Sequence, residues 1–137
     1  MFERCIYFNS NALTRYLNRR WDAAYGELGL TAPQAYLLRA ICQDSGVNQQ
    51  RLAVELHLEK STITRLLNML VGKKLILRQA GDSGREVRLQ ATDKGDKLCR
   101  QLDAVGEQLY QEMRKRLGAA QFDMLLSQLR TGIKALE

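Results

Sequence analysis

The sequence KSTITRLLNML, residues 60–70, predicts a short helix with one apolar face and one polar face. The apolar residues recur at the spacing of a buried helix face, at Ile63, Leu66, Leu67 and Leu70. The opposite face carries hydrogen-bonding and basic side chains, namely Lys60, Ser61, Thr62, Thr64, Arg65 and Asn68. Such a helix suits the major groove of DNA, where side-chain donors, acceptors and methyl groups can meet the base edges.

Two shorter helices are predicted upstream of this one. Thr31 and Gln34 have the spacing of a capping box, with Pro33 in the first turn, so a helix is expected from about residue 31 to 42. Its inward-facing residues are predicted to be Tyr36, Leu37, Ala40 and Ile41. Asn48 is a good cap for the next helix, which ends shortly before the helix at 60–70. A tight pair of short helices of this kind predicts a helix-turn-helix.

Downstream, the hydrophobic period changes from that of a helix to that of a strand. Gly72 is the expected stop of the helix, and Leu75–Leu77 is a short apolar run. Residues 79–84 have the composition of a turn, and the inward residues Val87, Leu89 and Ala91 alternate with polar ones. We therefore predict a β-hairpin with a slim tip, which places Arg85 for insertion into the minor groove and Asp82 for orienting an arginine.

Long amphipathic helices are predicted at both ends of the chain. The apolar stripes of residues 1–28 and 98–136 are too extensive for one small winged domain to cover, and Gly118 is expected to break the second one. Apolar patches of that size usually mark a partner surface, which favours a homodimer over helices that fold back within one chain.

Composition and charge narrow the function further. Of the net charge of +6, nearly all lies in residues 60–88, which hold seven basic and two acidic side chains. This concentration indicates a polyanionic partner. The three cysteines are widely spaced, no apolar run is long enough to cross a bilayer, and the first residues lack the pattern of a secretory signal, so a cytoplasmic protein is expected. We find no catalytic, metal-binding or phosphate-loop motif, and expect neither an enzyme nor a cofactor.

The predicted contacts with double-stranded DNA come from both helices of the pair and from the hairpin. They are Asn48, Gln49, Lys60, Ser61, Thr62, Thr64, Arg65, Asn68, Arg78, Ser83, Arg85 and Arg88. A two-fold symmetric dimer would present two such surfaces to a near-palindromic site.

The order of these elements resembles the MarR family of bacterial regulators. The resemblance is carried by LTAPQAYLL (residues 30–38), NQQRLA (48–53), KSTITRLL (60–67) and GREVRLQATDKG (84–95). It implies a mainly α-helical fold with a small β-hairpin wing, in a single domain over residues 1–137. The winged helix-turn-helix would span about 31–91, between dimerisation helices at about 1–28 and 93–136. It also implies a sequence-specific transcriptional regulator, with repression expected over activation.

Members of this family commonly respond to small phenolic or aromatic-acid ligands, or to oxidants. Candidate pocket residues for such a ligand are Tyr16, Arg20, Trp21 and Tyr36. Cys5 is the candidate redox residue, because a thiol at a helix start beside Arg4 can have a lowered pKa. Cys42 and Cys99 are expected to be buried and inert. Two alternatives stay open: a helical dimeric module that contacts protein instead of DNA, and a thiol-based sensor that uses Cys5.

Overall fold

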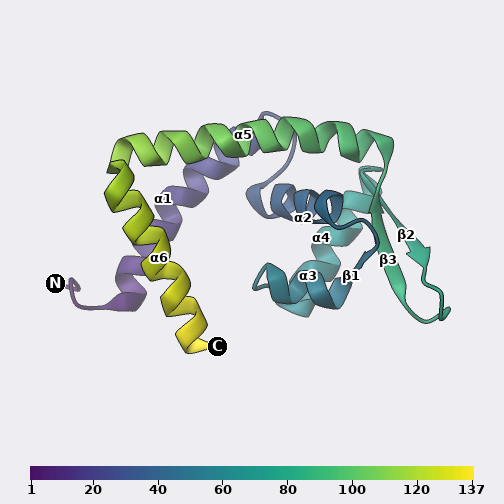
Figure 1. The fold of residues 1–137 in the computed structure, drawn as a ribbon, viewed down its shortest axis with the longest axis horizontal. Coiled ribbons are helices and arrows are strands. Elements are labelled where there is room, and N and C mark those ends of the chain that lie inside the picture. Colours follow the sequence, from purple (N-terminus) through teal and green to yellow (C-terminus); the bar gives the residue numbers. More distant parts are fainter. The chain divides into compact units, whose positions relative to one another are not determined.

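A computed structural model describes all residues, 1–137, and shows a mainly α-helical chain with a small antiparallel sheet (Figure 1). It contains two compact units, Met1–Asp103 and Ala104–Glu137. The elements are α1 (Ile6–Gly26), α2 (Ala32–Gln43), β1 (Val47–Asn48), α3 (Gln49–Glu55), α4 (Lys60–Gly72), β2 (Ile76–Ala80), β3 (Val87–Ala91), α5 (Asp93–Leu117) and α6 (Ala119–Leu136). None of the helices combines the length and the apolar character needed to cross a bilayer.

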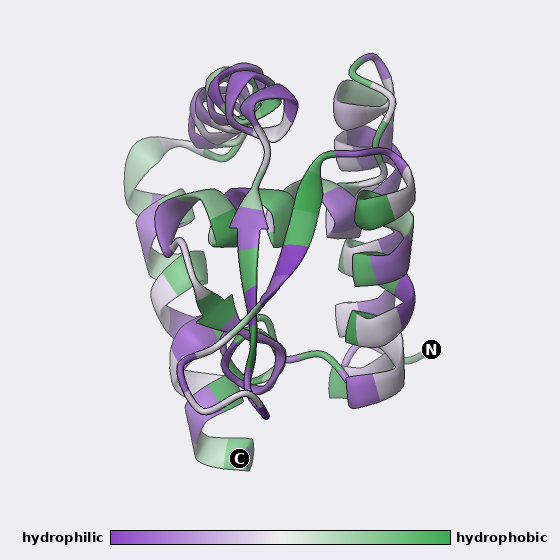
Figure 2. Cartoon of the chain, turned by 90° about the vertical axis from the view of Figure 1, so that its right-hand side faces the viewer, coloured by the Kyte–Doolittle hydropathy of each residue, from purple (hydrophilic) through white to green (hydrophobic).

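The helices form where capping and apolar spacing predict them. Thr31 and Gln34 make the complete capping box of α2, and the side chain of Asn48 accepts the backbone N–H of Arg51 at the start of α3. All four predicted apolar residues of α4 are buried, with at most 2% of their surface exposed. Burying a leucine or isoleucine contributes about 1.5–3 kcal/mol, so this face holds α4 firmly in the core. Figure 2 shows hydrophobic and hydrophilic residues interspersed along the helices, as expected of amphipathic helices.

The predicted hairpin is present, and a third strand joins it. β2 and β3 pair antiparallel with Arg78 opposite Leu89, and β1 pairs with the other edge of β3 through Val47 and Leu89. The strand order is therefore β1-β3-β2. β1 has only two residues, too few to show an alternating pattern, which is why the sequence predicted only two strands.

Two expectations about individual side chains were wrong. Tyr36 and Val87 were expected to face inward, but they are 40% and 48% exposed. Tyr36 lies at the edge of the α2 face that packs inward, and Val87 lies next to the exposed loop at the tip of the hairpin. The predicted stop of α4 is confirmed, because the helix ends at Gly72; Lys74, two residues later, adopts a positive φ of 61°.

A further correction concerns Cys42 and Cys99, which were expected to be inert thiols. They form a disulfide between α2 and α5 across a sequence separation of 57 residues. The two cysteines lie on different helices with no shared motif, so their spacing in sequence gave no sign of the pairing. Cys5 is the free cysteine of the chain.

The start of α5 is held against the base of the hairpin by three hydrogen bonds that involve Thr92. The Thr92 hydroxyl donates to the Lys74 carbonyl at 2.7 Å and accepts the backbone N–H of Gly95 at 3.1 Å. The Thr92 backbone N–H donates to the Leu75 carbonyl at 3.0 Å. Gly95 packs so closely here that a Cβ on it would lie 2.1 Å from the Leu75 carbonyl oxygen. Only glycine fits this contact without a shift of the backbone.

The second unit consists of the end of α5 and all of α6. Gly118 joins the two helices with a φ of 85°, which favours glycine. The rings of Tyr110 and Phe122 meet edge to face at 5.3 Å between centroids, and Arg114 pairs with Asp123. These contacts fix the turn between the helices, while much of the apolar face of α6 is left exposed.

We predict that Gly95→Ala destabilises the protein by about 3 kcal/mol, because the added methyl group must push the Leu75 carbonyl aside. Gly72→Ala is the matched control: it lies at the end of α4, where an added Cβ meets nothing within 4 Å. That change should be neutral or stabilise by up to about 1 kcal/mol. Chemical denaturation of both variants measures the difference, and equal stabilities would contradict the contact.

Candidate nucleic-acid interface

The orientation of α4 is fixed by α3 and by its own first turn. The Gln49 side-chain amide donates to the Thr64 hydroxyl at 2.6 Å, and that hydroxyl donates to the Lys60 carbonyl at 3.0 Å. Gln49 and Thr64 were both predicted to contact DNA, and the structure gives them this contact with each other. Their hydrogen bond joins the outer faces of α3 and α4, so the two helices present one continuous polar surface.

The outward face of α4 is a shallow, open hollow. It is lined by Lys60, Ser61, Thr64, Arg65, Asn68 and Met69. Five of these six residues were predicted to contact DNA. The predicted Thr62 is half-buried at the edge of this face. The hollow carries two basic side chains and no acidic one, and it is therefore suited to a negatively charged surface.

The hairpin is joined to α4 by an arginine. The Arg78 guanidinium on β2 donates to the Asn68 side-chain oxygen on α4 at 2.7 Å. Since Asn68 lines the hollow, Arg78 also lies at its border. This bond sets the position of the strand relative to the polar face of α4.

A second set of contacts joins β3 to the start of α3. The Arg88 guanidinium lies 3.7 Å from the Glu86 carboxylate, which also accepts a hydrogen bond from the Asn48 side chain at 3.4 Å. The wing carboxylate that contacts an arginine is thus Glu86, in place of the Asp82 that the sequence suggested. Of the predicted wing residues, Ser83 and Arg85 lie on the exposed loop between the strands.

Apart from the half-buried Thr62, the sequence-predicted residues therefore fall into two groups. The first group contacts neighbouring side chains and holds the elements together: Asn48, Gln49, Thr64, Asn68, Arg78 and Arg88. Lys60, Ser61, Arg65, Ser83 and Arg85 are exposed side chains on the first turns of α4 and on the hairpin loop. The second group is the part of the surface that can reach a partner without breaking a contact between elements.

An aromatic cluster lies on α1 and α2, where a ligand pocket was predicted. The Trp21 indole N–H donates to the Tyr36 hydroxyl at 3.1 Å. The Tyr36 ring meets Tyr25 edge to face at 5.9 Å and lies 5.3 Å from the Arg39 guanidinium carbon. The structure thus brings together two of the four predicted pocket residues. Tyr16 and Arg20, the other two, are half-buried on α1.

Arg39 is the residue of this cluster that the sequence prediction missed. Its guanidinium donates to Asp103 on α5 at 2.8 Å and to the buried Tyr25 hydroxyl at 3.1 Å. Burial raises the pKa of Tyr25 to about 12. Burial alone would lower the pKa of Arg39, but the hydrogen bond to Asp103 and the charge interactions with Tyr25, Asp103 and Tyr36 together outweigh it, so the pKa is raised. The available signal was the spacing, since Arg39 follows Tyr36 by three residues on one helix face.

Cys5 occupies the N-cap position of α1. Its sulfur accepts the backbone N–H of Phe8 at 3.4 Å, and the residue is half-buried. The predicted redox residue therefore lies at a helix start, as expected, and it is accessible in part.

Comparison with known protein families gives a match over the central part of the chain, which carries the candidate interface. Residues 28–86 match the model of the MarR family. No curated protein is similar enough in sequence to count as a match.

Solved structures with the same fold cover nearly the whole chain. The chain is similar to the transcriptional regulator SlyA, with a TM-score of 0.85 at 22% identity over 96% of this chain and 94% of that one. It is also similar to MepR of S. aureus in a DNA complex, with a TM-score of 0.85 at 20% identity over 95% and 96% of the two chains. For a mutant of MarR from E. coli in complex with operator DNA, the TM-score is 0.84 at 25% identity over 96% of both chains.

The matched segment begins just before α2, includes the α3–α4 pair and ends at the hairpin loop, so it contains the polar hollow and most of the wing. Residues 28–86 therefore match the MarR family, and the chain as a whole has the fold of solved winged helix-turn-helix transcriptional regulators.

Proposed function

We propose that the protein binds double-stranded DNA sequence-specifically, with α4 in the major groove and the hairpin loop at the minor groove. The observation that carries this proposal is the hollow on α4, whose polar lining is exposed because the opposite face of the helix is buried. Arg65 in the second turn is placed to meet a base edge or a phosphate. The backbone amides at the start of α4, with Ser61, suit a phosphate.

The hairpin supports the same proposal. Its loop carries Arg85 beside Gly84, which has a φ of 70°, so the tip is narrow where the guanidinium emerges. A guanidinium on a narrow tip suits the negative potential of the minor groove. The relatives MepR and MarR, whose structures contain DNA, share this fold.

We further propose that the protein acts as a homodimer, with residues about 31–91 binding DNA and the flanking helices forming the interface. Each unit exposes an apolar face of its own. On α1 the exposed residues are Ile6, Tyr7 and Phe8; on α6 they are Met124, Leu126, Leu129, Ile133 and Leu136. A second copy would remove both faces from water. Two-fold symmetry would then set two α4 helices about 34–36 Å apart, one turn of DNA.

Regulation is proposed to be repression that a small phenolic or aromatic-acid ligand relieves. Support for the ligand comes from the cluster at Trp21 and Tyr36, where an exposed ring, an indole and a guanidinium lie together. An aromatic ligand could stack on the Tyr36 ring and direct an acidic group toward Arg39. Cytoplasmic localisation fits a protein that acts on DNA.

Arg65→Ala and Arg85→Ala are each expected to weaken DNA binding by about 1–3 kcal/mol, because each removes a guanidinium from the groove surface. The affinity of the unmodified protein should fall steeply with rising salt, as phosphate contacts release counterions. Fluorescence anisotropy with a labelled duplex measures both effects. Arg100→Ala, an exposed arginine on α5, is the control and should bind as the unmodified protein does.

A module that contacts protein instead of DNA would give a different result. It would bind the duplex weakly at every salt concentration and would not respond to either arginine change. That outcome would remove the DNA-binding proposal.

Ile133→Glu should split the dimer, because it places a charge on the apolar face of α6. Sedimentation analysis should give twice the 15.6 kDa chain mass for the unmodified protein and a single chain mass for the variant at micromolar concentration. Gln128→Glu adds the same charge at an exposed polar position of α6 and should stay dimeric. A monomeric unmodified protein would refute the dimer.

Trp21 is the only tryptophan, so its fluorescence reports on the aromatic cluster alone. We expect 4-hydroxybenzoate to change this fluorescence saturably and to release labelled DNA over the same concentration range. Tyr36→Phe removes the hydroxyl that accepts the Trp21 N–H, and should weaken ligand binding by about fivefold. Tyr7→Phe, at an exposed position of α1, is the control. No saturable change at millimolar ligand would count against this ligand class.

A further inference from the structure

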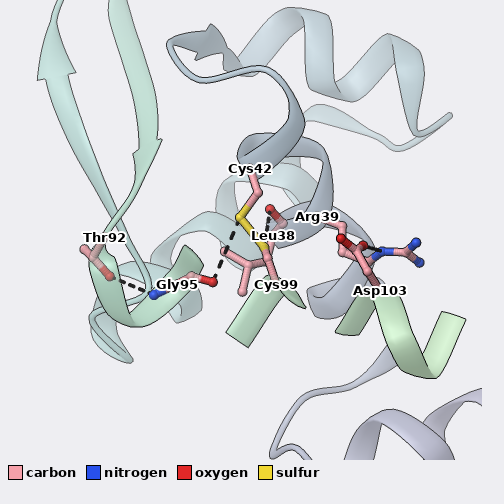
Figure 3. The surroundings of a disulfide bond; sticks show 7 residues. All are labelled: Leu38, Arg39, Cys42, Thr92, Gly95, Cys99 and Asp103. Atoms are coloured by element: carbon pink, nitrogen blue, oxygen red, sulfur yellow. Dashed lines mark hydrogen bonds and ion pairs between the residues drawn. A yellow bond between two sulfur atoms is a disulfide. The ribbon is translucent and has the colours of Figure 1, made fainter. Parts of the chain in front are cut away.

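The disulfide between Cys42 and Cys99 joins the last turn of α2 to the second turn of α5 (Figure 3). Neither cysteine belongs to the groove surface or to the aromatic cluster. The bond closes a loop of the chain that contains β1, α3, α4 and the whole hairpin. Its formation or loss therefore acts on the segment that carries every proposed DNA contact.

Backbone carbonyl groups near the two sulfur atoms can accept hydrogen bonds from the thiols of the reduced form. The Leu38 carbonyl oxygen lies 3.6 Å from the Cys99 sulfur, and the Gly95 carbonyl oxygen lies 4.0 Å from the Cys42 sulfur (Figure 3). On reduction the two sulfur atoms must separate from bonding distance to van der Waals contact, and each new thiol has a backbone carbonyl close by that can accept its S–H group. Reduction therefore leaves no buried polar group without a partner.

The two sulfurs differ in access. Cys99 is 95% buried, because its exposed fraction is 5%, whereas Cys42 is half-buried. A small oxidant in solution can therefore reach Cys42 first, and Cys99 stands behind it as the resolving thiol.

We propose that Cys42 and Cys99 form a reversible dithiol–disulfide site that reacts with a small peroxide and tightens DNA binding when oxidised. The effect on DNA rests on the proposed function, and the thiol chemistry stands apart from it. Cys5 takes no part in the reaction.

The reaction balances in two steps. The Cys42 thiolate attacks one peroxide oxygen, so an S–O bond forms, the O–O bond breaks, and water or an alcohol leaves after it takes up a proton. The Cys99 thiolate then attacks the Cys42 sulfur, so the S–S bond forms, the S–O bond breaks, and hydroxide leaves as water. The two thiols lose two electrons in total, and the peroxide gains them. A dithiol reductant reverses the change through a mixed disulfide.

The coupling to DNA binding follows from what else the start of α5 contacts. Thr92 and Gly95 hold this part of α5 against Lys74 and Leu75 at the base of the hairpin. With the bond closed, α2, the start of α5 and the hairpin base form one cross-linked body. A surface that is already ordered loses less freedom when it binds, so the oxidised form should bind DNA more tightly.

Reduction loosens this arrangement without unfolding it. Arg39 lies three residues before Cys42, and its partner Asp103 lies four residues after Cys99, so their ion pair joins the same two helices. Leu38 and Leu102 are fully buried beside the two cysteines, and we expect this packing to keep α2 and α5 together after reduction.

The first test measures the thiols and uses no DNA. In a Cys5→Ser background, the folded protein is treated with dithiothreitol or with hydrogen peroxide, alkylated, and analysed by mass spectrometry. We expect two alkylated cysteines after dithiothreitol and none after peroxide. A pair that stays oxidised in dithiothreitol until the protein is unfolded, or stays reduced in peroxide, would overturn the proposal.

The order of attack is tested by trapping the sulfenic acid with dimedone. Cys99→Ser should trap it readily at Cys42, whereas Cys42→Ser should trap little at Cys99. The alanine variants at the same two positions repeat the measurement if a serine variant folds poorly. Equal trapping at both positions would overturn the assignment of Cys42 as the reacting thiol.

The second test compares the DNA affinity of the two forms on one duplex at one salt concentration. We expect the oxidised form to bind at least about fivefold more tightly, and Cys42→Ser to give one affinity with or without peroxide. Equal affinities, or tighter binding by the reduced form, would overturn the coupling. If neither form binds DNA at low salt, the proposed function fails, while the alkylation result still decides the thiol chemistry.

Discussion

The arrangement of the Met1–Asp103 unit depends on one constraint: α4 has a single apolar face, and that face is buried. Once Ile63, Leu66, Leu67 and Leu70 pack in the core, the remaining residues of the helix must face outward. The polar hollow is therefore a consequence of core packing, and it needs no further interaction to be exposed. The contact of α3 with Thr64 and the contact of the hairpin with Asn68 then fix the borders of that surface.

Much of the fold could be predicted because its signals are local. The capping box at Thr31 and Gln34, the cap at Asn48 and the break at Gly118 each act within a few residues, and each lies where the structure begins or ends a helix. The leucine spacing of α4 gave its buried face for the same reason. Periodicity and capping depend on neighbours in the chain, and a single sequence shows those directly.

The features that the sequence did not show are those that depend on distant residues. The pairing of Cys42 with Cys99 and the ion pair of Arg39 with Asp103 both join α2 to α5, which are far apart in the chain. β1 is a strand only because Val47 meets Leu89. The site prediction had the same limit: it listed the polar residues of the helix and hairpin together, and it could not separate Asn68 and Arg78, which bind each other, from the exposed Arg85.

The hydrogen bond between Arg78 and Asn68 has a consequence for how DNA specificity could change in evolution. A substitution at Asn68 that altered base recognition by α4 would also release the guanidinium that positions β2, and so would shift the hairpin. The two elements that we propose for the major and the minor groove are therefore not independent modules. A descendant of this protein that acquired a new operator would need compensating substitutions in both elements, and intermediates with only one of them would bind either sequence poorly.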